Sequence, residues 1–212
     1  MSCMVVMLGL LQFCFKVRAM SFSKTDNSLP TVVVLAAGRS ERFKAASGGQ
    51  HKLDTMLQGR SVLERTLANV QASGLPFHVV RAADIAHIEN AGMGDSIATG
   101  VVATQNANGW LILPADLPLV LPKTLFALAL ELASHEVVVP VYENQRGHPV
   151  GFSVMCGEAL RKVSGDQGAA RVVAQHKAHL VSVDDIGCVL DVDTPAQLAQ
   201  AEKVLLERSQ TG

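Results

Sequence analysis

Residues 32–53 read VVVLAAGRSERFKAASGGQHKL, and this stretch predicts both the fold and the position of a binding site. Its first five residues are β-branched or apolar, which is typical of a buried strand. At Gly38 the backbone can pass close to a ligand, because glycine has no Cβ to obstruct the approach. Backbone N–H groups freed at a strand-to-helix turn favour anions, and Arg39, Arg42 and Lys52 add positive charge nearby. The stretch therefore predicts a site for a triphosphate.

The composition indicates a single domain with an aliphatic core. At 212 residues the chain is long enough for one sizeable domain and short for two. Hydrophobic residues make up 49% of it and aromatic residues only 4%, so the core side chains are expected to be aliphatic. A net charge of −1 gives no basic face for nucleic acid, so an anionic ligand must be bound by local features.

The beginning of the chain is apolar but does not have the pattern of a membrane span or a signal peptide. Residues 4–15 are too few to cross a bilayer. Lys16 and Arg18 follow them, whereas a secretory signal carries its positive charge in front. We expect residues 1–30 to be an N-terminal extension with little order and residues 31–212 to form one domain. No stable membrane insertion is expected.

The four cysteines predict neither a disulfide scaffold nor a zinc site. Cys3, Cys14, Cys156 and Cys188 are scattered without CxxC or zinc-ligand spacing. We interpret them as buried or idle thiols in a reducing compartment, which predicts a cytoplasmic protein.

Strand-like and helix-like segments alternate along the chain. Strands are expected over residues 32–36, 77–80, 110–113, 137–141, 150–155, 178–183 and 188–192. Helices are expected over residues 60–72, 96–104, 123–133, within 161–177, and over 195–207. This alternation predicts an α/β fold with three layers, in which helices cover both faces of a doubly wound, mostly parallel sheet. In such sheets ligands bind beyond the carboxyl ends of the strands.

An aspartate stands directly after the third expected strand. Asp116 is framed by Pro114 and Pro118, which restrict the backbone and hold the carboxylate at the strand end. Hard Mg²⁺ prefers one or two carboxylates together with phosphate oxygens from the substrate. The residues alone leave two interpretations of Asp116, a metal ligand or the cap of the next helix.

A second acidic cluster, DVDTP, occupies residues 191–195. Residues two apart in an extended segment point to the same side, so Asp191 and Asp193 can face one site. Either Asp193 or Thr194 can instead cap the helix that begins at Pro195, because proline suits the first helical turn. We expect Asp191 to be the metal ligand and Asp193 or Thr194 to be the cap.

The run from Leu35 to Arg42, followed by Lys52 and Leu53, resembles the signature loop of MobA-like nucleotidyltransferases. More narrowly, it is similar to the molybdenum cofactor cytidylyltransferase branch of that family. Neither Walker A nor Rossmann glycine spacing is present. Further segments resemble the family's motifs in the family's order: GMGDSI at 92–97, ADLP at 115–118, QRGHPV at 145–150, GDQGAAR at 165–171 and DVDTP at 191–195.

The resemblance implies a Rossmann-like nucleotidyltransferase fold and transfer of CMP from CTP to the phosphate of the molybdopterin cofactor, with release of pyrophosphate. The implied nucleotide-binding residues are Leu35, Ala36, Ala37, Gly38, Arg39, Ser40, Arg42, Lys52, Gly92, Met93 and Ser96. Arg42, Lys52 and Asp116 are the implied catalytic residues, with Mg²⁺ on Asp116 and Asp191. Arg146 and His148 are implied to bind the acceptor, and a recipient molybdoenzyme is a possible further partner.

The same resemblance favours CTP over GTP. Guanylyl-transferring relatives usually carry Ala-Gly-Gly where this chain has Ala36-Ala37-Gly38. The alternatives are another nucleoside triphosphate, a sugar- or alcohol-phosphate acceptor, and a non-catalytic carrier of the molybdenum cofactor. Residues 43–51 depart from the family by forming a longer loop, which leaves Lys44 as a competitor for the role of Lys52.

Several of these segments also have a plain structural interpretation. Residues 92–97 can be an ordinary helix start, with Asp95 or Ser96 as the cap, and Asp166 can cap the helix that follows it. A single histidine such as His148 is more often a structural group than a ligand.

Overall fold

A computed structural model of the protein describes residues 29–210 of the chain. The expected N-terminal extension, with Cys3 and Cys14, lies almost entirely outside the described residues. Cys156 and Cys188 are both buried free thiols. Within residues 29–210, no helix combines the length and the apolar character needed to cross a membrane.

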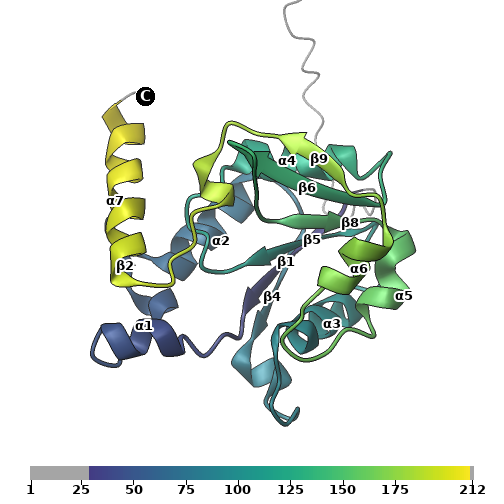
Figure 1. The fold of residues 1–212 in the computed structure, drawn as a ribbon, viewed down its shortest axis with the longest axis horizontal. Helices are drawn as coiled ribbons and strands as arrows, with labels where there is room; N and C mark the ends of the chain where they lie inside the picture. Colours follow the sequence, from purple (N-terminus) through teal and green to yellow (C-terminus); the bar gives the residue numbers. More distant parts are fainter. Residues whose placement is uncertain (1–28, 211–212) are drawn as a thin grey trace, which may run out of the picture.

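A seven-stranded sheet forms the centre of the fold (Figure 1). The strand order is β4-β1-β5-β8-β6-β7, and β9 pairs with β6. The strands are β1 (Thr31–Ala36), β4 (Phe77–Arg81), β5 (Trp110–Pro114), β6 (Val137–Tyr142), β7 (Gln145–Arg146), β8 (Val150–Phe152) and β9 (His179–Ser182). Strand β1 is parallel to β4 and β5, β6 is parallel to β9, and β8 is antiparallel to both of its neighbours.

Helices cover both faces of this sheet. The α-helices are α1 (Glu41–Ala46), α2 (Val62–Ala72), α3 (Met93–Ala103), α4 (Pro122–Glu131), α5 (Gly157–Leu160), α6 (Ala170–Gln175) and α7 (Pro195–Gln210). Short 3₁₀ helices span Lys52–Asp54 (η1), Ala82–Ile85 (η2), Val154–Cys156 (η3) and Ile186–Cys188 (η4). A hairpin of β2 (Met56–Leu57) and β3 (Arg60–Ser61) lies apart from the main sheet.

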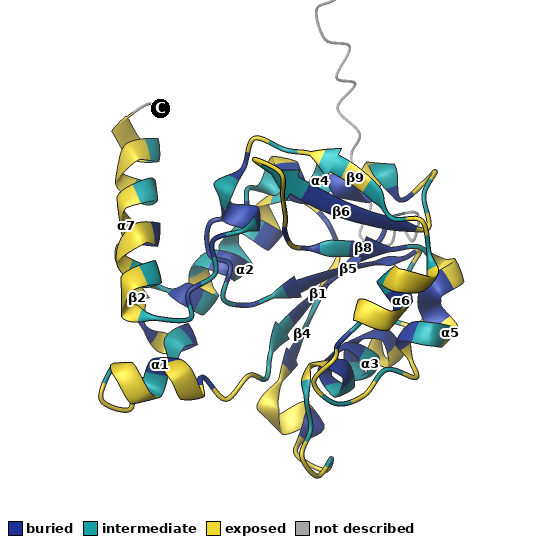
Figure 2. Cartoon of the chain, viewed as in Figure 1, coloured by how far each residue is buried: buried dark blue, intermediate teal, exposed yellow. Residues whose placement is uncertain are grey.

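The alternation of side chains along β1 builds the two hydrophobic layers. Val32 and Val34 are fully buried in the core that contains α2 and α4, while Val33 is fully buried in the core that contains α3, α5 and α6. The burial colours show β5, β6 and most of β1 in dark blue, whereas β9 is teal and yellow (Figure 2). Helix α3 packs closely on the sheet, because a Cβ on Gly100 would lie 2.3 Å from Val33 Cγ1. The predicted three-layer, mostly parallel α/β fold is confirmed.

Several predicted boundaries and elements are wrong. Helix α3 begins at Met93 and not at Ser96, and Asp95 accepts a hydrogen bond from the Gly92 N–H (2.8 Å) from inside the first turn. The loop expected over residues 43–51 contains most of α1, whose Phe43 side chain is buried. The hairpin of β2 and β3 was not predicted, because strands of two residues are too short to show alternation.

The strand expected over residues 188–192 does not form. A 3₁₀ turn and irregular chain take its place, because tight contacts hold this segment against two others. A Cβ on Gly187 would lie 2.2 Å from the carbonyl carbon of Leu119, and the Cys188 carbonyl accepts a hydrogen bond from the His148 N–H (2.8 Å). The segment therefore crosses the edge of the core and does not pair with the sheet.

The buried carboxylate of Asp185 fixes the start of this segment. Its oxygens accept hydrogen bonds from the N–H of Leu121 (2.8 Å), the hydroxyl of Thr124 (2.8 Å) and the N–H of Gly187 (3.0 Å). The guanidinium of Arg208 pairs with it at 3.0 Å, and the Asp185 side chain is 0% exposed. One carboxylate thus joins the beginning of α4, the turn η4 and the end of α7.

Replacement of Asp185 is predicted to destabilise the fold strongly. Asp185→Ala removes the acceptor of two buried backbone N–H groups and of the Thr124 hydroxyl, together with the ion-pair partner of the partly exposed Arg208, and should lower the free energy of unfolding by about 3 kcal/mol. Urea denaturation measures this change. The control is Asp184→Ala at the neighbouring exposed position, which should change stability by less than about 0.5 kcal/mol. Equal stability of the two variants would contradict the role given to Asp185.

Candidate active site

A cavity of about 500 Å³ opens at the carboxyl ends of β1 and β5. Its walls come from the loop after β1, the turn η1, the segment before and within α3, the end of β5 and the loop before α6. The lining residues are Leu35, Ala37, Gly38, Arg39, Ser40, Glu41, Lys52, Leu53, Ile85, Asn90, Ala91, Gly92, Met93, Ser96, Pro114, Asp116 and Asp166. The cavity lies where ligands bind in open α/β sheets.

The loop after β1 presents unpaired backbone donors beside this cavity. Within residues 29–210, the N–H groups of Gly38, Arg39 and Ser40 have no hydrogen-bond acceptor. A Cβ on Gly38 would meet no atom within 4 Å, so packing within the protein does not require glycine here. The absent side chain leaves open space beside the loop. Ser40 adopts a left-handed conformation with φ 57°, which an L-residue rarely accepts. The loop is thus held in a shape that suits an anion.

His51 connects this loop to the turn that carries Lys52. Its Nδ1 accepts a hydrogen bond from the Leu53 N–H (3.3 Å), which leaves Nε2 as the protonated nitrogen of the neutral ring. Nε2 lies 3.1 Å from the carbonyl oxygen of Gly38 and 3.1 Å from the hydroxyl of Ser40. The imidazole therefore links the loop that carries the unpaired backbone donors to the turn that carries Lys52.

Two acidic segments meet at the end of β5. The N–H of Val192 donates to the carbonyl oxygen of Asp116 (2.9 Å), and the Val192 side chain is fully buried. Asp191 and Asp193 flank this fixed residue, and their carboxylates turn toward that of Asp116. One oxygen of each of the three carboxylates lies within 4.8 Å of the others.

Lys52 and Arg42 neutralise part of this acidic cluster. The Lys52 ammonium contacts Asp116 Oδ2 at 2.5 Å and also bonds the Asp193 carboxylate. The Arg42 guanidinium pairs with the other oxygen of Asp193 at 2.5 Å, although the Arg42 side chain is 80% exposed. The sequence places both cations next to the phosphates of a ligand, whereas in this structure they are paired with carboxylates. Arg39 is exposed and lines the cavity.

The pKa shifts follow from this crowding of charges. Burial alone lowers the pKa of Lys52, but the charges and hydrogen bonds of Asp116 and Asp193 outweigh it, so the pKa is raised and the ammonium stays protonated. Burial raises the pKa of Asp191, and the negative charges of Asp193 and Asp116 raise it further. An added cation would therefore stabilise the charged form of Asp191.

The cluster fits a hard divalent cation. Within the described residues, Asp116 Oδ1 is buried and has no hydrogen-bond partner. An unsatisfied buried carboxylate oxygen is costly unless a cation or water completes it. Oxygen ligands from carboxylates are those that Mg²⁺ and Mn²⁺ prefer. Asp116, Asp191 and Asp193 are the residues that would hold such an ion.

Gln197 fixes the DVDTP turn from the first turn of α7. Its side-chain oxygen accepts from the Asp193 N–H (3.2 Å) and the Thr194 hydroxyl (2.9 Å), and its side-chain nitrogen donates to Asp191 Oδ1 (2.8 Å). Thr194 caps the helix by accepting from the Gln197 N–H (3.3 Å). Of the two expected caps, Thr194 is the one observed. Asp193 belongs to the acidic cluster instead, although it was not among the predicted metal ligands.

The opposite wall is built where α3 meets the loop before α6. Asp95 Oδ2 accepts hydrogen bonds from the N–H groups of Gly92 (2.8 Å) and Gly165 (2.9 Å), and these bonds lower the pKa of Asp95. A Cβ on Gly92 would lie 2.4 Å from the carbonyl carbon of Gly165, so only glycine allows this approach. Asp166 lines the cavity and does not cap a helix, because α6 begins at Ala170.

The two residues expected to bind the acceptor lie outside the cavity lining. Arg146 is exposed in β7, and His148 is exposed in the turn that follows. Desolvation by surrounding protein lowers the pKa of His148, while the charge of Asp116 acts in the opposite direction. His148 is therefore within electrostatic reach of the acidic cluster, and Gly147 packs against the backbone of Cys188.

The structure brings most of the predicted nucleotide residues to one place. Leu35, Ala37, Gly38, Arg39, Ser40, Lys52, Gly92, Met93, Ser96 and Asp116 line the cavity, and Ala36 and Arg42 do not. Sequence reasoning missed His51, Asn90, Asp166 and Gln197 as site residues. Asn90 has φ 53°, a conformation that asparagine tolerates better than most residues, but the sequence alone carries no signal for it.

Comparison with known proteins identifies the class. Residues 32–180 match the model of the MobA-like NTP transferase domain. The chain therefore belongs to the MobA-like NTP transferase family, and its class is that of the nucleotidyltransferases. A search of curated proteins found no match.

Solved structures agree with this assignment. Rv0371c from Mycobacterium tuberculosis H37Rv is 27% identical, with a TM-score of 0.69 over 82% of this chain and 98% of that one. The same protein in complex with manganese gives 23% identity and a TM-score of 0.62 over 82% and 98% of the two chains. The nucleotidyl transferase Mth528 of Methanothermobacter thermautotroptrophicus shares the fold at 19% identity and a TM-score of 0.70, over 85% and 99%. Molybdopterin-guanine dinucleotide biosynthesis protein A of Archaeoglobus fulgidus shares it at 17% and 0.61, over 84% and 99%.

Loss of the His51 ring is predicted to weaken nucleotide binding without unfolding the protein. His51→Ala removes the bonds that hold the Gly38 carbonyl and Ser40, so the loop must be ordered by the ligand at a cost of about 5- to 10-fold in affinity. Calorimetric titration with each nucleoside triphosphate in the presence of Mg²⁺ measures this. His87→Ala, at an exposed position outside the cavity lining, is the control and should bind as the wild type does.

Proposed function

We propose that the protein transfers CMP from CTP to the phosphate of the molybdopterin cofactor. An oxygen of the acceptor phosphate attacks the α-phosphorus of CTP, the bond to the β-phosphate breaks, and pyrophosphate leaves. The observation that carries this proposal is the placement of the unpaired loop donors and the Asp116 carboxylate on the walls of one cavity. Transfer of this kind depends on positioning and on neutralisation of charge, and needs little covalent chemistry from the protein.

The loop after β1 holds the triphosphate. N–H groups of Gly38, Arg39 and Ser40 donate to phosphate oxygens, and the exposed Arg39 guanidinium adds a cation beside them. The backbone of residues 35–37 contacts the base. Ser96 and Met93, on the first turns of α3, line the same cavity and bound the nucleotide on the other side.

Asp116, Asp191 and Asp193 would hold Mg²⁺, which supplies positive charge to the phosphate oxygens when it is bound. Lys52 and Arg42 are already in place at this cluster and carry the rest of the compensating charge. We infer that, when the nucleotide binds, Lys52 and Arg42 give up some of their contacts with Asp193 and contact phosphate oxygens instead. The orphaned Asp116 Oδ1 supports the metal assignment.

Arg146 and His148 bind the acceptor from outside the cavity lining. Both are exposed, so they are free to meet a second substrate that arrives from solvent. The charge of Asp116 influences His148, which supports a position close to the point of transfer. The identity of the acceptor rests on the resemblance of residues 145–150 to the family branch that uses CTP.

We also propose that the protein is cytoplasmic, that it delivers its product to a molybdoenzyme, and that residues 31–212 form one catalytic domain.

The proposal predicts which substrates release pyrophosphate. With molybdopterin cofactor and Mg²⁺ present, CTP should support release at least about 10-fold faster than ATP, GTP or UTP. Asp116→Asn should lower the rate at least about 100-fold, because the cluster loses an essential oxygen ligand. Asp184→Asn, at an exposed site, is the control variant.

The outcomes separate the alternatives. Release with a sugar phosphate but not with molybdopterin would identify a different acceptor, and preference for another nucleoside triphosphate would overturn the choice of CTP. Binding of the molybdopterin cofactor without any pyrophosphate release would identify a carrier and refute the enzymatic proposal.

Nucleotide choice is predicted to depend on Ala37. This residue lines the cavity where the guanylyl-transferring relatives have glycine. Removal of its methyl group in Ala37→Gly widens the space for the base, so the rate with GTP relative to CTP should rise at least about 10-fold. Ala133→Gly, at an exposed position outside the cavity lining, is the control. An unchanged ratio in Ala37→Gly would show that the base is selected elsewhere.

A further inference from the structure

A second group of potential metal ligands lies at the far end of the sheet from the active site. Glu131 is the last residue of α4, His135 lies four residues later in the turn before β6, and His179 is the first residue of β9. His179 pairs with Val138 near the start of β6, at the amino ends of the parallel strands. None of the three lines the active-site cavity, which opens at the carboxyl ends.

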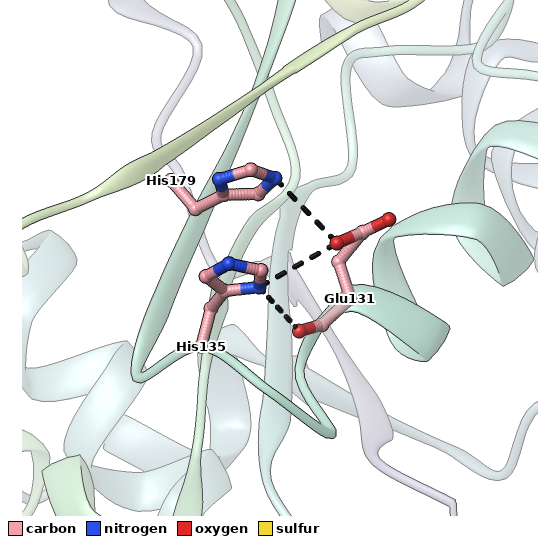
Figure 3. Close-up of side chains that lie close together, drawn as sticks. All are labelled: Glu131, His135 and His179. Atoms are coloured by element: carbon pink, nitrogen blue, oxygen red, sulfur yellow. Dashed lines mark hydrogen bonds and ion pairs between the residues drawn. The ribbon is translucent and has the colours of Figure 1, made fainter.

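The side chains converge on one point. The two imidazole rings are stacked, with centroids 3.7 Å apart and an angle of 8° between the planes. Both rings direct a nitrogen toward the Glu131 carboxylate (Figure 3). His135 Nδ1 and His179 Nε2 each lie 3.5 Å from Glu131 Oε2, and the ligand atoms of all three residues lie within 4.8 Å of one another.

The distances match metal ligands better than hydrogen-bond partners. A separation of 3.5 Å is longer than an ordinary N–H···O bond, which is at most about 3.2 Å. Two ligand atoms on a tetrahedral ion with bonds of about 2.1 Å are about 3.4 Å apart. The two nitrogen–oxygen distances thus match the donor spacing of such a site, and the stacked rings must tilt toward each other to direct both lone pairs at one ion. His135 Nδ1 also donates to the Glu131 carbonyl oxygen at 3.0 Å, and a metal bound at Nδ1 would take the place of this proton.

We propose that Glu131, His135 and His179 form a binding site for a zinc-type divalent transition ion, with water as the fourth ligand. Two imidazoles and one carboxylate favour Zn²⁺ and its neighbours in the transition series over Mg²⁺. The side chains are 34–41% exposed, so an ion can enter from solvent without unfolding the protein. The bound ion links the end of α4 to β9, which pairs with β6 alone within the described part of the chain. It therefore stabilises this edge of the sheet, and its role is separate from nucleotidyl transfer.

Zinc titration of the metal-free protein tests the site. The full chain, with any affinity tag removed, is stripped with a chelator and titrated calorimetrically in excess Mg²⁺, which competes with zinc for the carboxylate cluster of the active site. We expect one zinc site in the wild type. Affinity should fall at least about 10-fold in Glu131→Gln, His135→Gln and His179→Gln, because each loses one ligand. Zinc should raise the wild-type melting temperature by about 3 °C or more, and should raise it less in these variants.

Two controls define the result that overturns the proposal. His87→Gln changes an exposed histidine elsewhere, and His176→Gln changes the histidine that pairs with Glu136 (2.8 Å) and lies 3.7 Å from Cys156 Sγ. Both should bind zinc as the wild type does. Loss of binding in His176→Gln but not in His179→Gln would place the ion elsewhere, and absence of zinc binding in the wild type would refute the site. If a variant does not fold, zinc-induced shifts of the His135 and His179 ring signals in the wild-type NMR spectrum decide the matter.

Discussion

Mutual repulsion of three carboxylates is the constraint on which the active site depends. Asp116, Asp191 and Asp193 place their oxygens within 4.8 Å, and such proximity is unfavourable unless positive charge lies between them. Lys52 supplies that charge in the structure by bonding two of the three. Burial, together with the charges of Asp193 and Asp116, still raises the pKa of Asp191. A site of this kind is prepared for a further cation, and a cation that also binds phosphate links the cluster directly to the triphosphate loop.

The fold supplies the force that holds these charges together. Val192 is buried and bonded to the backbone of Asp116, so its two acidic neighbours cannot move away from the strand end. Upstream, the buried carboxylate of Asp185 and the tight packing of Gly187 fix the path of the same segment. Downstream, Gln197 holds the turn through three hydrogen bonds. Packing and hydrogen bonds in the core thus hold the three carboxylates close together despite their repulsion.

Local patterns in the sequence were sufficient for the fold and for half of the site. The apolar run at β1 and the small residues after it predict a buried strand and a binding loop, because both signals lie within a few neighbouring residues. The segment from Cys188 to Val192 was wrongly predicted as a strand, since its path is set by a hydrogen bond of Cys188 to His148 and by the packing of the preceding Gly187 on Leu119, both distant in sequence. His51 was missed for a related reason. The contact of His51 with Gly38 depends on how α1 and the following turn fold back on the loop. The number of residues between them does not reveal this.

The two clusters of potential metal ligands lie at opposite ends of the sheet and differ in chemistry. They therefore suit different metal ions. Three carboxylates beside the unpaired backbone donors of the loop after β1 suit a hard ion with oxygen ligands, whereas two imidazoles and one carboxylate suit a borderline-soft ion. The lysine inside the first cluster opposes binding of any cation that is not accompanied by an anion able to accept the displaced ammonium. Such a site favours a metal–nucleotide complex over the free metal. No cationic side chain bonds the second cluster within residues 29–210, where the structure shows only the three ligands facing one another. An ion can bind there without a partner, which suits a site that stabilises the fold and takes no part in turnover.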